Sequence, residues 1–261
     1  MDLSLKGKNA VICGSSQGIG LAAALELSLL GANCILLARN EVALSEALKQ
    51  LDTSKGQSHQ IAVADFSNPV SVHSAIEVIV ANQFIHILIN NTGGPAGGAI
   101  VEATEEAFLN TFNQHLICNH ILTKAVVPGM QSSGYGRIIN IISTSVKVPL
   151  KNLGVSNTIR GAVASWSKTM ANELGQFNIT VNNVLPGATA TQRLEGIVKA
   201  NAEKKGVKQE DITEEMIKEI PMKRFGQASE IAAVVAFLAS PAASYVNGAS
   251  IPVDGGRTGS I

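Results

Sequence analysis

The amino-acid sequence predicts a doubly wound α/β fold, with a seven-stranded parallel sheet and helices on both faces of the sheet. Apolar runs of strand length alternate with longer segments of helical periodicity along the chain. The short runs are rich in Ile, Val and Leu without polar alternation, which is typical of strands buried on both faces. Alternation of this kind also implies right-handed crossovers between parallel strands.

The expected strands occupy seven ranges: 9–13, 33–38, 60–65, 85–91, 136–143, 179–187 and 249–254. The expected helices lie between them, at 21–31, 41–51, 69–80, about 105–130, 161–175 and 230–240. A chain of 261 residues is long enough to bury one large core. We therefore expect a single domain over residues 1–261.

Residues 189–220 interrupt the alternation. This segment is polar, rich in Lys and Glu, and contains two weak helical stretches between a strand end and the next helix. It is either a solvated helical excursion or a lid over a substrate site, and its position favours the lid.

The composition excludes several classes of function. Lys plus Arg and Asp plus Glu both number 20, so the chain carries no basic surplus for nucleic acid or anionic lipid. The first apolar run is too short for a signal peptide, and no segment approaches the roughly 18–20 apolar residues of a membrane helix. Cys13, Cys34 and Cys118 lie in apolar runs without metal-ligand spacing, so we expect buried thiols, no metal site and a cytoplasmic location.

Small and polar residues follow the carboxyl end of nearly every expected strand. The segments in question are CGSSQGIG, ARN, ADFS, NNTGGP, ISTS and LPGATAT. In doubly wound sheets, ligands bind outside the carboxyl ends of the strands. The sequence therefore predicts a ligand site where these segments converge.

The first of these segments has the glycine spacing of a dinucleotide-binding loop. Gly14, Gly18 and Gly20 form a G-x-x-x-G-x-G pattern between a strand and a helix. Glycines there allow a tight turn and close approach of a pyrophosphate, which the helix N-terminus binds through its free N–H groups. The loop residues expected to contact the cofactor are Gly14, Ser15, Ser16, Gln17, Gly18, Ile19 and Gly20.

The residue after the second strand indicates which dinucleotide binds. An acidic residue there would bind the ribose 2′-hydroxyl of NAD, but the sequence places Arg39 at this point. A guanidinium suits a 2′-phosphate, so we expect NADP(H) in preference to NAD(H), with Ser15 and Ser16 as further hydroxyl donors. The alternative is that Arg39 merely flanks the start of a helix.

Across essentially its whole length the chain resembles the short-chain dehydrogenase/reductase family, and most closely its 3-oxoacyl-[acyl-carrier-protein] reductase branch. The segments that carry the resemblance occur in the family's order. They are CGSSQGIG (13–20), ADFS (64–67), NNTG (90–93), GRIINIIS (136–143), ITVNNVLPG (179–187), RFGQASEIA (224–232) and YVNGASIPVDGG (245–256).

The resemblance implies a Rossmann-type fold with further cofactor contacts. Asp65 and the Phe66 backbone would flank the adenine, and Asn91 and Gly93 would line the cofactor cleft. The residues implied at the nicotinamide and pyrophosphate are Pro186, Gly187, Thr189 and Thr191. The family also implies a homotetramer, or at least a homodimer, built on the long fourth and fifth helices and the last strand.

The family's chemistry uses Asn, Ser, Tyr and Lys, and this chain matches only one of the four. Ser143 matches the catalytic serine. Ser156 stands at the tyrosine position, Arg160 at the lysine position and His115 at the asparagine position. A serine hydroxyl is a poor proton donor and an arginine does not relay protons, although its charge can hold a ribose or an anionic group of cofactor or substrate. The ordinary Tyr/Lys acid–base step therefore cannot run here.

Other groups are candidates for the missing proton donor. His115 titrates near neutrality in water, but a buried structural histidine is the favoured alternative. Lys147 and Lys151 lie in the loop before Ser156, where solvated loop lysines are the favoured alternative, and a bound water is a slower source.

Two hypotheses remain open. One is an NADP(H)-dependent oxidoreductase of divergent mechanism, acting on a carbonyl or hydroxyl substrate such as an acyl thioester. The other is a catalytically inactive dinucleotide-binding protein that serves as a sensor, scaffold or partner subunit.

Overall fold

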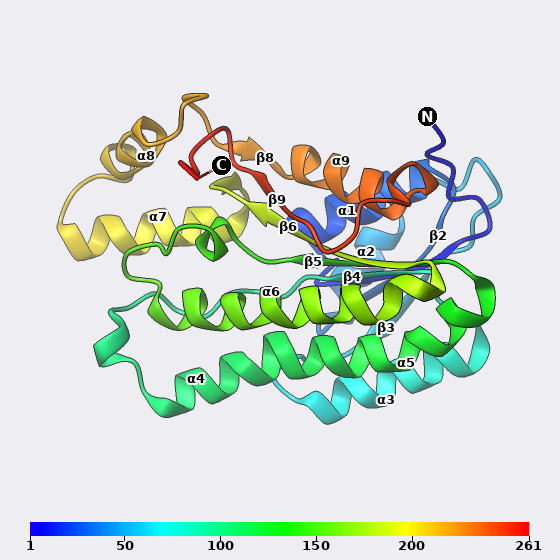
Figure 1. The fold of residues 1–261 in the computed structure, drawn as a ribbon. Coiled ribbons are helices and arrows are strands. Elements are labelled where there is room, and N and C mark those ends of the chain that lie inside the picture. Colours follow the sequence, from blue (N-terminus) through cyan, green and yellow to red (C-terminus); the bar gives the residue numbers. More distant parts are fainter. Residues whose placement is uncertain (261) are drawn as a thin grey trace.

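A computed structural model describes residues 1–260 and contains a seven-stranded parallel sheet (Figure 1). Its strand order is β3-β2-β1-β4-β5-β6-β9, and every neighbouring pair is parallel. The strands are β1 (Asn9–Cys13), β2 (Asn33–Ala38), β3 (Gln60–Val63), β4 (Ile87–Asn90), β5 (Gly136–Ile141), β6 (Ile179–Pro186) and β9 (Ser250–Val253). The predicted fold class is confirmed.

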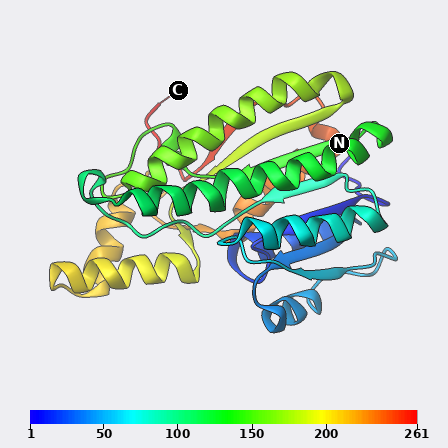
Figure 2. The same cartoon turned by 90° about the horizontal axis from the view of Figure 1, so that it is seen from below.

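Helices cover both faces of this sheet. Helices α1 (Gly18–Leu29), α2 (Glu41–Leu48) and α9 (Ala228–Ala239) pack on one face. Helices α3 (Pro69–Asn82), α5 (Cys118–Ser133) and α6 (Gly154–Leu174) pack on the other, below the sheet in Figure 1 and toward the viewer in Figure 2. Short 3₁₀ turns occur at Ile100–Glu102, Thr144–Val146, Gly175–Phe177 and Pro241–Ala243.

Consecutive strand residues belong to different cores, which explains the unbroken apolar runs in the sequence. On β1, Val11 packs into the core beneath α3 and α5, while Ile12 packs into the core beneath α1 and α9. Leu88 and Ile89 on β4 divide in the same way. Side chains alternate between the faces of a strand, so a strand covered on both faces needs apolar residues at every position.

Several strands end earlier than the sequence predicts. Strand β3 ends at Val63 and β5 at Ile141, each two residues before its expected end. The residues beyond these ends turn out of the sheet into polar loops. Because β2 and β4 lie on opposite sides of β1, the chain reverses its direction of sheet growth there, and loops from both halves meet at the carboxyl end of β1.

The long helix expected over 105–130 is interrupted. Helix α4 (Glu105–Phe112) passes into a π-helical turn, Asn113–Ile117, and continues as α5 to Ser133. The turn contains His115, and such π-helical insertions are frequent at functional sites.

The segment 189–220 contains helices α7 (Gln192–Lys205) and α8 (Gln209–Lys218), which stand away from the sheet in both views (Figures 1 and 2). A small apolar cluster holds them together, formed by Leu194, Val198, Ala202 and Ile212. A two-stranded sheet that the sequence did not predict lies at their base, where β7 (Thr189–Ala190) pairs with β8 (Gly226–Gln227).

The three cysteines are buried and unpaired, as expected from their apolar surroundings. Burial raises the pKa of the Cys34 and Cys118 thiols to about 12, so neither is a reactive thiolate at neutral pH. None of the helices within residues 1–260 combines the length and apolar composition that crossing a bilayer requires.

Candidate active site

The glycine loop between β1 and α1 is packed so closely that side chains cannot replace its glycines. Gly14 and Gly18 both have φ of 59°, in the left-handed region that glycine adopts most readily. A Cβ on Gly20 would lie 2.2 Å from the carbonyl oxygen of Gly14, and one on Gly14 would lie 2.6 Å from that of Asn91. The backbone of this loop therefore forms a tight cradle in which the glycines at 14 and 20 leave no room for a side chain.

Neighbouring groups hold the cradle in place. The Asn91 side chain donates from Nδ2 to the carbonyl oxygens of Cys13 and Gly14, at 3.2 and 3.3 Å, and so ties the end of β4 to the loop. Gln17 precedes α1, but its side chain does not cap the helix. The Gln17 side chain therefore accepts no hydrogen bond from the first N–H groups of α1. Such groups at a helix N-terminus are suited to bind an anion.

The serines of the loop differ from the sequence expectation. Ser15 is fully buried, and its Oγ accepts a 3.0 Å hydrogen bond from the backbone N–H of Leu37. Its hydroxyl therefore braces the loop against β2 and is not open to a ligand. Ser16 is half-buried, and the expectation of a hydroxyl donor rests on this residue alone. Ile19 packs against the core beneath α1.

Arg39 and Asp65 stand at the ends of β2 and β3. Arg39 is exposed and has no ion pair within residues 1–260. Asp65 accepts a 2.9 Å hydrogen bond from the Ser67 N–H. Hydrogen bonds from Ser67 lower the pKa of the Asp65 carboxyl, and the charge of Arg39 lowers it further to a lesser extent. Phe66 packs on the core beneath α3, and its carbonyl accepts from the Cys118 thiol. Arg39 is thus free for an added anion.

The loop after β6 reaches the glycine loop from the opposite side. A Cβ on Gly18 would lie 3.6 Å from Cγ2 of Thr191, so the two loops touch. The Thr191 hydroxyl caps α7, accepting from the Leu194 N–H at 3.4 Å, and Thr189 donates to the carbonyl of Gly187 at 3.1 Å. Pro186 is the last residue of β6. Gly93, by contrast, is exposed, and a Cβ there would meet nothing within 4 Å.

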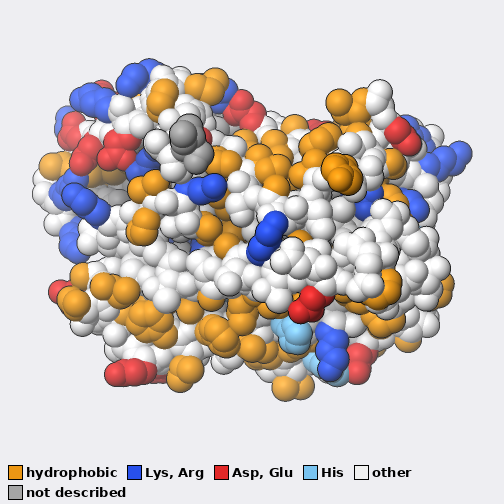
Figure 3. Space-filling model, viewed as in Figure 1, with side chains coloured by type: hydrophobic (Ala, Val, Ile, Leu, Met, Phe, Trp, Pro, Cys, Tyr) orange, Lys and Arg blue, Asp and Glu red, His pale blue; other side chains and the backbone are white. Residues whose placement is uncertain are grey.

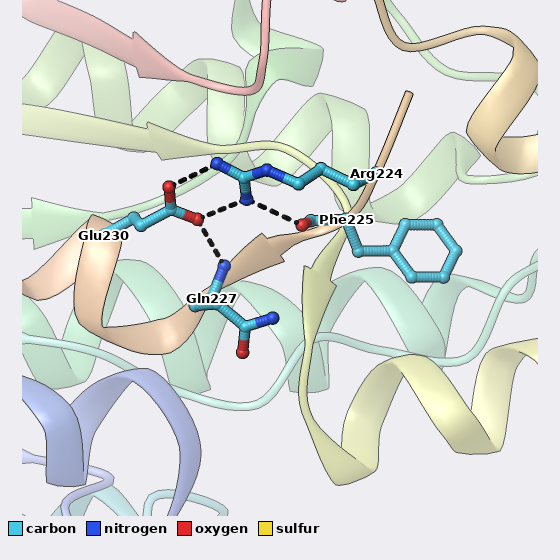
Figure 4. A network of polar contacts seen from close by, with 4 residues as sticks. All are labelled: Arg224, Phe225, Gln227 and Glu230. Carbon is cyan, nitrogen blue, oxygen red and sulfur yellow. Dashed lines mark hydrogen bonds and ion pairs between the residues drawn. The ribbon is translucent and has the colours of Figure 1, made fainter. Parts of the chain in front are cut away.

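An ion-pair network fixes the base of this second loop (Figure 4). Arg224 donates two hydrogen bonds to the Glu230 carboxylate, at 2.7 and 2.6 Å, and Glu230 also accepts from the Gln227 N–H at 2.8 Å. Hydrogen bonding by Arg224 lowers the pKa of Glu230 to about 2. Next to this network, the Gly226 N–H donates to the carbonyl of Ala188 at 3.0 Å. The RFGQASE segment thereby anchors the loop that follows β6.

Of the candidate catalytic residues, Ser143 and Arg160 lie near the end of β5, and Ser156 lies one turn before Arg160 on α6. Ser143 follows β5 and its Oγ accepts a 3.1 Å hydrogen bond from the Ser145 N–H. Ser156 and Arg160, one turn apart, both face inward on α6 and are 9% and 8% exposed. Arg160 donates from Nη1 to the carbonyl of Ile141, 3.1 Å away, which places its guanidinium at the end of β5, two residues before Ser143.

His115 is buried on the π-helical turn, with 3% of its surface exposed. Its Nδ1 lies 2.6 Å from the Thr92 hydroxyl, while Nε2 has no hydrogen-bond partner among the described residues. Burial, and then the charge of Arg160, lower the pKa of His115 to about 3. At neutral pH the ring is therefore uncharged and holds no proton in excess for a reaction.

Other proton donors lie elsewhere. Lys147 and Lys151 are exposed loop residues. Tyr135 precedes β5, at the opposite end of that strand from Ser143, and its hydroxyl donates to the carbonyl of Ala239 at 2.6 Å. Tyr245 is fully exposed near β9. Neither tyrosine is placed to serve the site at Ser143.

Arg193, in the first turn of α7, belongs to the site although no sequence pattern indicates it. Its Nη2 donates to the carbonyl of Pro95 at 2.7 Å. A Cβ on Gly94 would lie 3.4 Å from Nη2 of Arg193 and 3.5 Å from Nη2 of Arg160, so both guanidinium groups border this glycine. No spacing in the sequence could have signalled this, because α7 and the loop after β4 are nearly a hundred residues apart along the chain.

The sheet order, the switch point at β1 and the glycine cradle define a protein of the Rossmann type. A family model described as "Enoyl-(Acyl carrier protein) reductase" matches residues 14–258. The 3-oxoacyl-[acyl-carrier-protein] reductase FabG of Pseudomonas aeruginosa is 36% identical, covering 97% of this chain and 98% of the relative. The chain belongs to the short-chain dehydrogenase/reductase family of oxidoreductases.

Other relatives agree with this assignment. The NADPH-dependent reductase BacG of Bacillus subtilis is 31% identical over 97% of this chain and 99% of the relative. Among solved structures, L-sorbose reductase from Gluconobacter frateurii, complexed with NADPH and L-sorbose, superposes with a TM-score of 0.93. It is 32% identical and covers all of both chains.

Proposed function

We propose that the protein is an NADP(H)-dependent oxidoreductase that acts on a carbonyl or hydroxyl group of a small molecule without a tyrosine general acid. The observation that carries the proposal is the contrast between an intact glycine cradle and the pair Ser156 and Arg160 at the tyrosine and lysine positions. Two relatives support the choice of cofactor, since one is described as NADPH-dependent and another was solved with NADPH.

The residues at the cradle fit a dinucleotide. The close contacts around Gly14 and Gly20 exclude side chains from the loop, and the start of α1 lacks a side-chain cap from Gln17, so its first N–H groups suit a phosphate. Arg39, free of acidic partners within 4 Å in residues 1–260, would hold a 2′-phosphate. The nicotinamide ring would supply or accept the hydride.

The chain's own residues would then hold the oxygen of the substrate. The Ser143 and Ser156 hydroxyls are the neutral donors of the site, and the Arg160 guanidinium would stabilise negative charge that develops on this oxygen. Arginine holds its proton, so water would deliver the proton to the product. The loss of a positioned general acid costs about 10²–10⁴-fold in rate.

A second candidate function is dinucleotide binding without catalysis, in a sensor, scaffold or partner subunit. The lowered pKa of His115 favours it, because the histidine carries no extra proton at pH 7. Self-association would suit either function. Apolar side chains gather over α4 and the loop before it (Figure 3), where Ile100, Val101 and Leu109 are 53, 90 and 63% exposed. A homodimer or homotetramer would cover them.

Thermal unfolding and turnover together test both functions. NADPH should raise the melting temperature more than NADH does, and Arg39→Ala should remove the difference while leaving the NADH effect in place. Lys49→Ala, an exposed cation at the end of α2, is the matched control. An equal response to both dinucleotides, or to neither, would contradict the proposed cofactor. Slow but measurable oxidation of NADPH by acetoacetyl thioesters or by acetoacetate supports the oxidoreductase, and none with either compound supports the second candidate.

A further inference from the structure

Two arginines that lack acidic partners meet on the substrate side of the cleft. Nη2 of Arg160 and Nη2 of Arg193 lie 3.5 and 3.4 Å from the point where a Cβ on Gly94 would stand. Neither guanidinium has a carboxylate within 4 Å in the part of the chain that the structure describes. The two cationic groups are therefore at most about 7 Å apart, with no charge between them to offset their repulsion.

The burial of Arg160 makes this arrangement costly without a counterion. Its side chain is 92% removed from solvent, since only 8% of the residue is exposed, and the hydrogen bond it makes is to the neutral carbonyl of Ile141. Burial, followed by the charge of Arg193, lowers the pKa of Arg160 to about 10. A buried charge ordinarily has an ionic partner, because desolvation without one is strongly unfavourable.

The fold holds both arginines in place. Arg160 is anchored at the end of β5, and Arg193 donates to the carbonyl of Pro95. The loop that contains Gly94 and Pro95 is itself tied down, because Gly98 forms a parallel bridge with Leu153 immediately before α6. The pair is thus held by hydrogen bonds to two separate segments of the chain, and a backbone bridge fixes the loop between them.

The position of the pair distinguishes it from the phosphate sites of the cofactor. The glycine cradle and the start of α1 lie at β1, and Arg39 lies at the end of β2. Arg160 instead reaches the end of β5, two residues before Ser143, where the reacting oxygen of the substrate would be held. Arg193 lies two residues after Thr191, which touches the glycine loop at Gly18, but Arg160 places the pair beside Ser143, and this favours an anion of the substrate.

We infer that Arg160 and Arg193 bind a carboxylate of the substrate, so that the protein acts on carbonyl or hydroxyl compounds that carry a free carboxylate close to the reacting carbon. A carboxylate with one oxygen facing each guanidinium spans the gap, because charge-assisted hydrogen bonds are about 2.8 Å long. This inference rests on the proposed function for the reaction itself. It differs from the acyl-thioester expectation in requiring a free carboxylate close to the reacting carbon of the substrate.

Binding of a matched pair of probes to the NADPH-bound protein tests the inference without depending on turnover. Acetoacetate and methyl acetoacetate share the ketone and differ in the charge of the terminal group. We expect acetoacetate to bind the wild-type protein by calorimetry, and Arg193→Gln to weaken it by about tenfold or more, as truncation of one partner of a charge pair does. The ester should bind weakly and equally to both.

Control variants separate this effect from a general loss of positive charge. Lys199→Gln removes an exposed cation from the same helix and should leave acetoacetate binding unchanged, while Arg193→Lys should retain part of it. Equal affinity for acid and ester, or unchanged acetoacetate binding in Arg193→Gln, would overturn the inference.

The cofactor is titrated separately. If Arg193→Gln weakens NADPH binding and spares acetoacetate, the arginines hold cofactor phosphate and the substrate assignment is wrong. If the wild-type protein binds no dinucleotide but the apo protein binds acetoacetate through Arg193, the proposed function fails and the carboxylate site stands.

Discussion

The cofactor side and the substrate side of the candidate site are built from different parts of the chain. On the cofactor side, the closest packing of the glycine loop is against backbone atoms, as where a Cβ on Gly20 would come within 2.2 Å of the Gly14 carbonyl, and the Asn91 and Ser15 side chains hold the loop in place. On the substrate side, the groups that face the cleft are side chains on α6, α7 and the π-helical turn. A backbone-built site tolerates few substitutions, whereas side chains on a rigid frame can be exchanged without altering the frame. The side chains that carry out the reaction can therefore change while the loop that binds the cofactor stays the same.

The largest expected effect comes from restoring the family's side chains on the substrate side. The variant His115→Asn, Ser156→Tyr, Arg160→Lys would supply a phenol and an ammonium one helical turn apart on the inward face of α6. We expect its NADPH-dependent reduction of acetoacetyl thioesters to exceed the wild-type rate by about 10²–10⁴-fold, the usual contribution of a positioned acid. Steady-state kinetics measures the gain.

A phenylalanine version is the matched control for this gain. His115→Asn, Ser156→Phe, Arg160→Lys adds nearly the same volume without the hydroxyl, and should remain at the wild-type rate. Equal activity of the two variants would show that the gain does not come from proton transfer. It would then contradict the view that only the side chains at positions 115, 156 and 160, and not the fold around them, limit the reaction.

On the cofactor side, by contrast, we expect even the addition of one methyl group to abolish function. Gly20→Ala places a Cβ against the Gly14 carbonyl, so the loop must shift; we expect loss of detectable NADPH binding and a stability cost of about 1–3 kcal/mol. Fluorescence titration and denaturant unfolding measure the two effects.

Gly161→Ala is the matched control, since a Cβ on Gly161 within α6 would meet nothing within 4 Å. It should bind NADPH normally and gain about 0.5–1 kcal/mol of stability from the lower entropy of the unfolded chain. Normal NADPH binding by Gly20→Ala would show that the cradle is less rigid than its contacts indicate.

The smallest effect concerns the protonation of His115. Its pKa in the folded protein is about 3, below its ordinary value of 6.5, so between these values the unfolded chain binds more protons. Stability should thus fall as the pH decreases below 6.5, by about 1.4 kcal/mol per pH unit from this residue. Urea unfolding of the wild type and His115→Asn at pH 7.5 and 5.5 measures the difference.

The exposed His120 on α5, which has no ion pair among residues 1–260, provides the comparison, and His120→Asn should follow the wild type. If His115→Asn loses as much stability as the wild type between the two pH values, the ring of His115 is already accessible to protons in the folded state.

The sequence predicts the structure of these regions to different extents. The strands were predictable because their two-sided burial leaves an unbroken apolar pattern, and the glycine loop because its spacing reflects backbone conformation. The burial of the Ser15 hydroxyl was not predictable, since its partner, the Leu37 N–H, lies on another strand. The π-helical turn around His115 was not predictable either, because a one-residue insertion leaves the helical periodicity of the sequence almost unchanged.

The sequence by itself determined the fold class and the glycine loop, because burial and backbone geometry restrict the residue types of these local patterns. The four positions at which catalytic residues were expected came instead from the resemblance to the family. Only the tertiary structure decided what those side chains meet: that His115 is buried beside Thr92, and that Arg193 reaches the neighbourhood of Arg160. The physical reason is that charge–charge and hydrogen-bond partners are set by packing between distant segments, and packing leaves no periodic trace in a single chain.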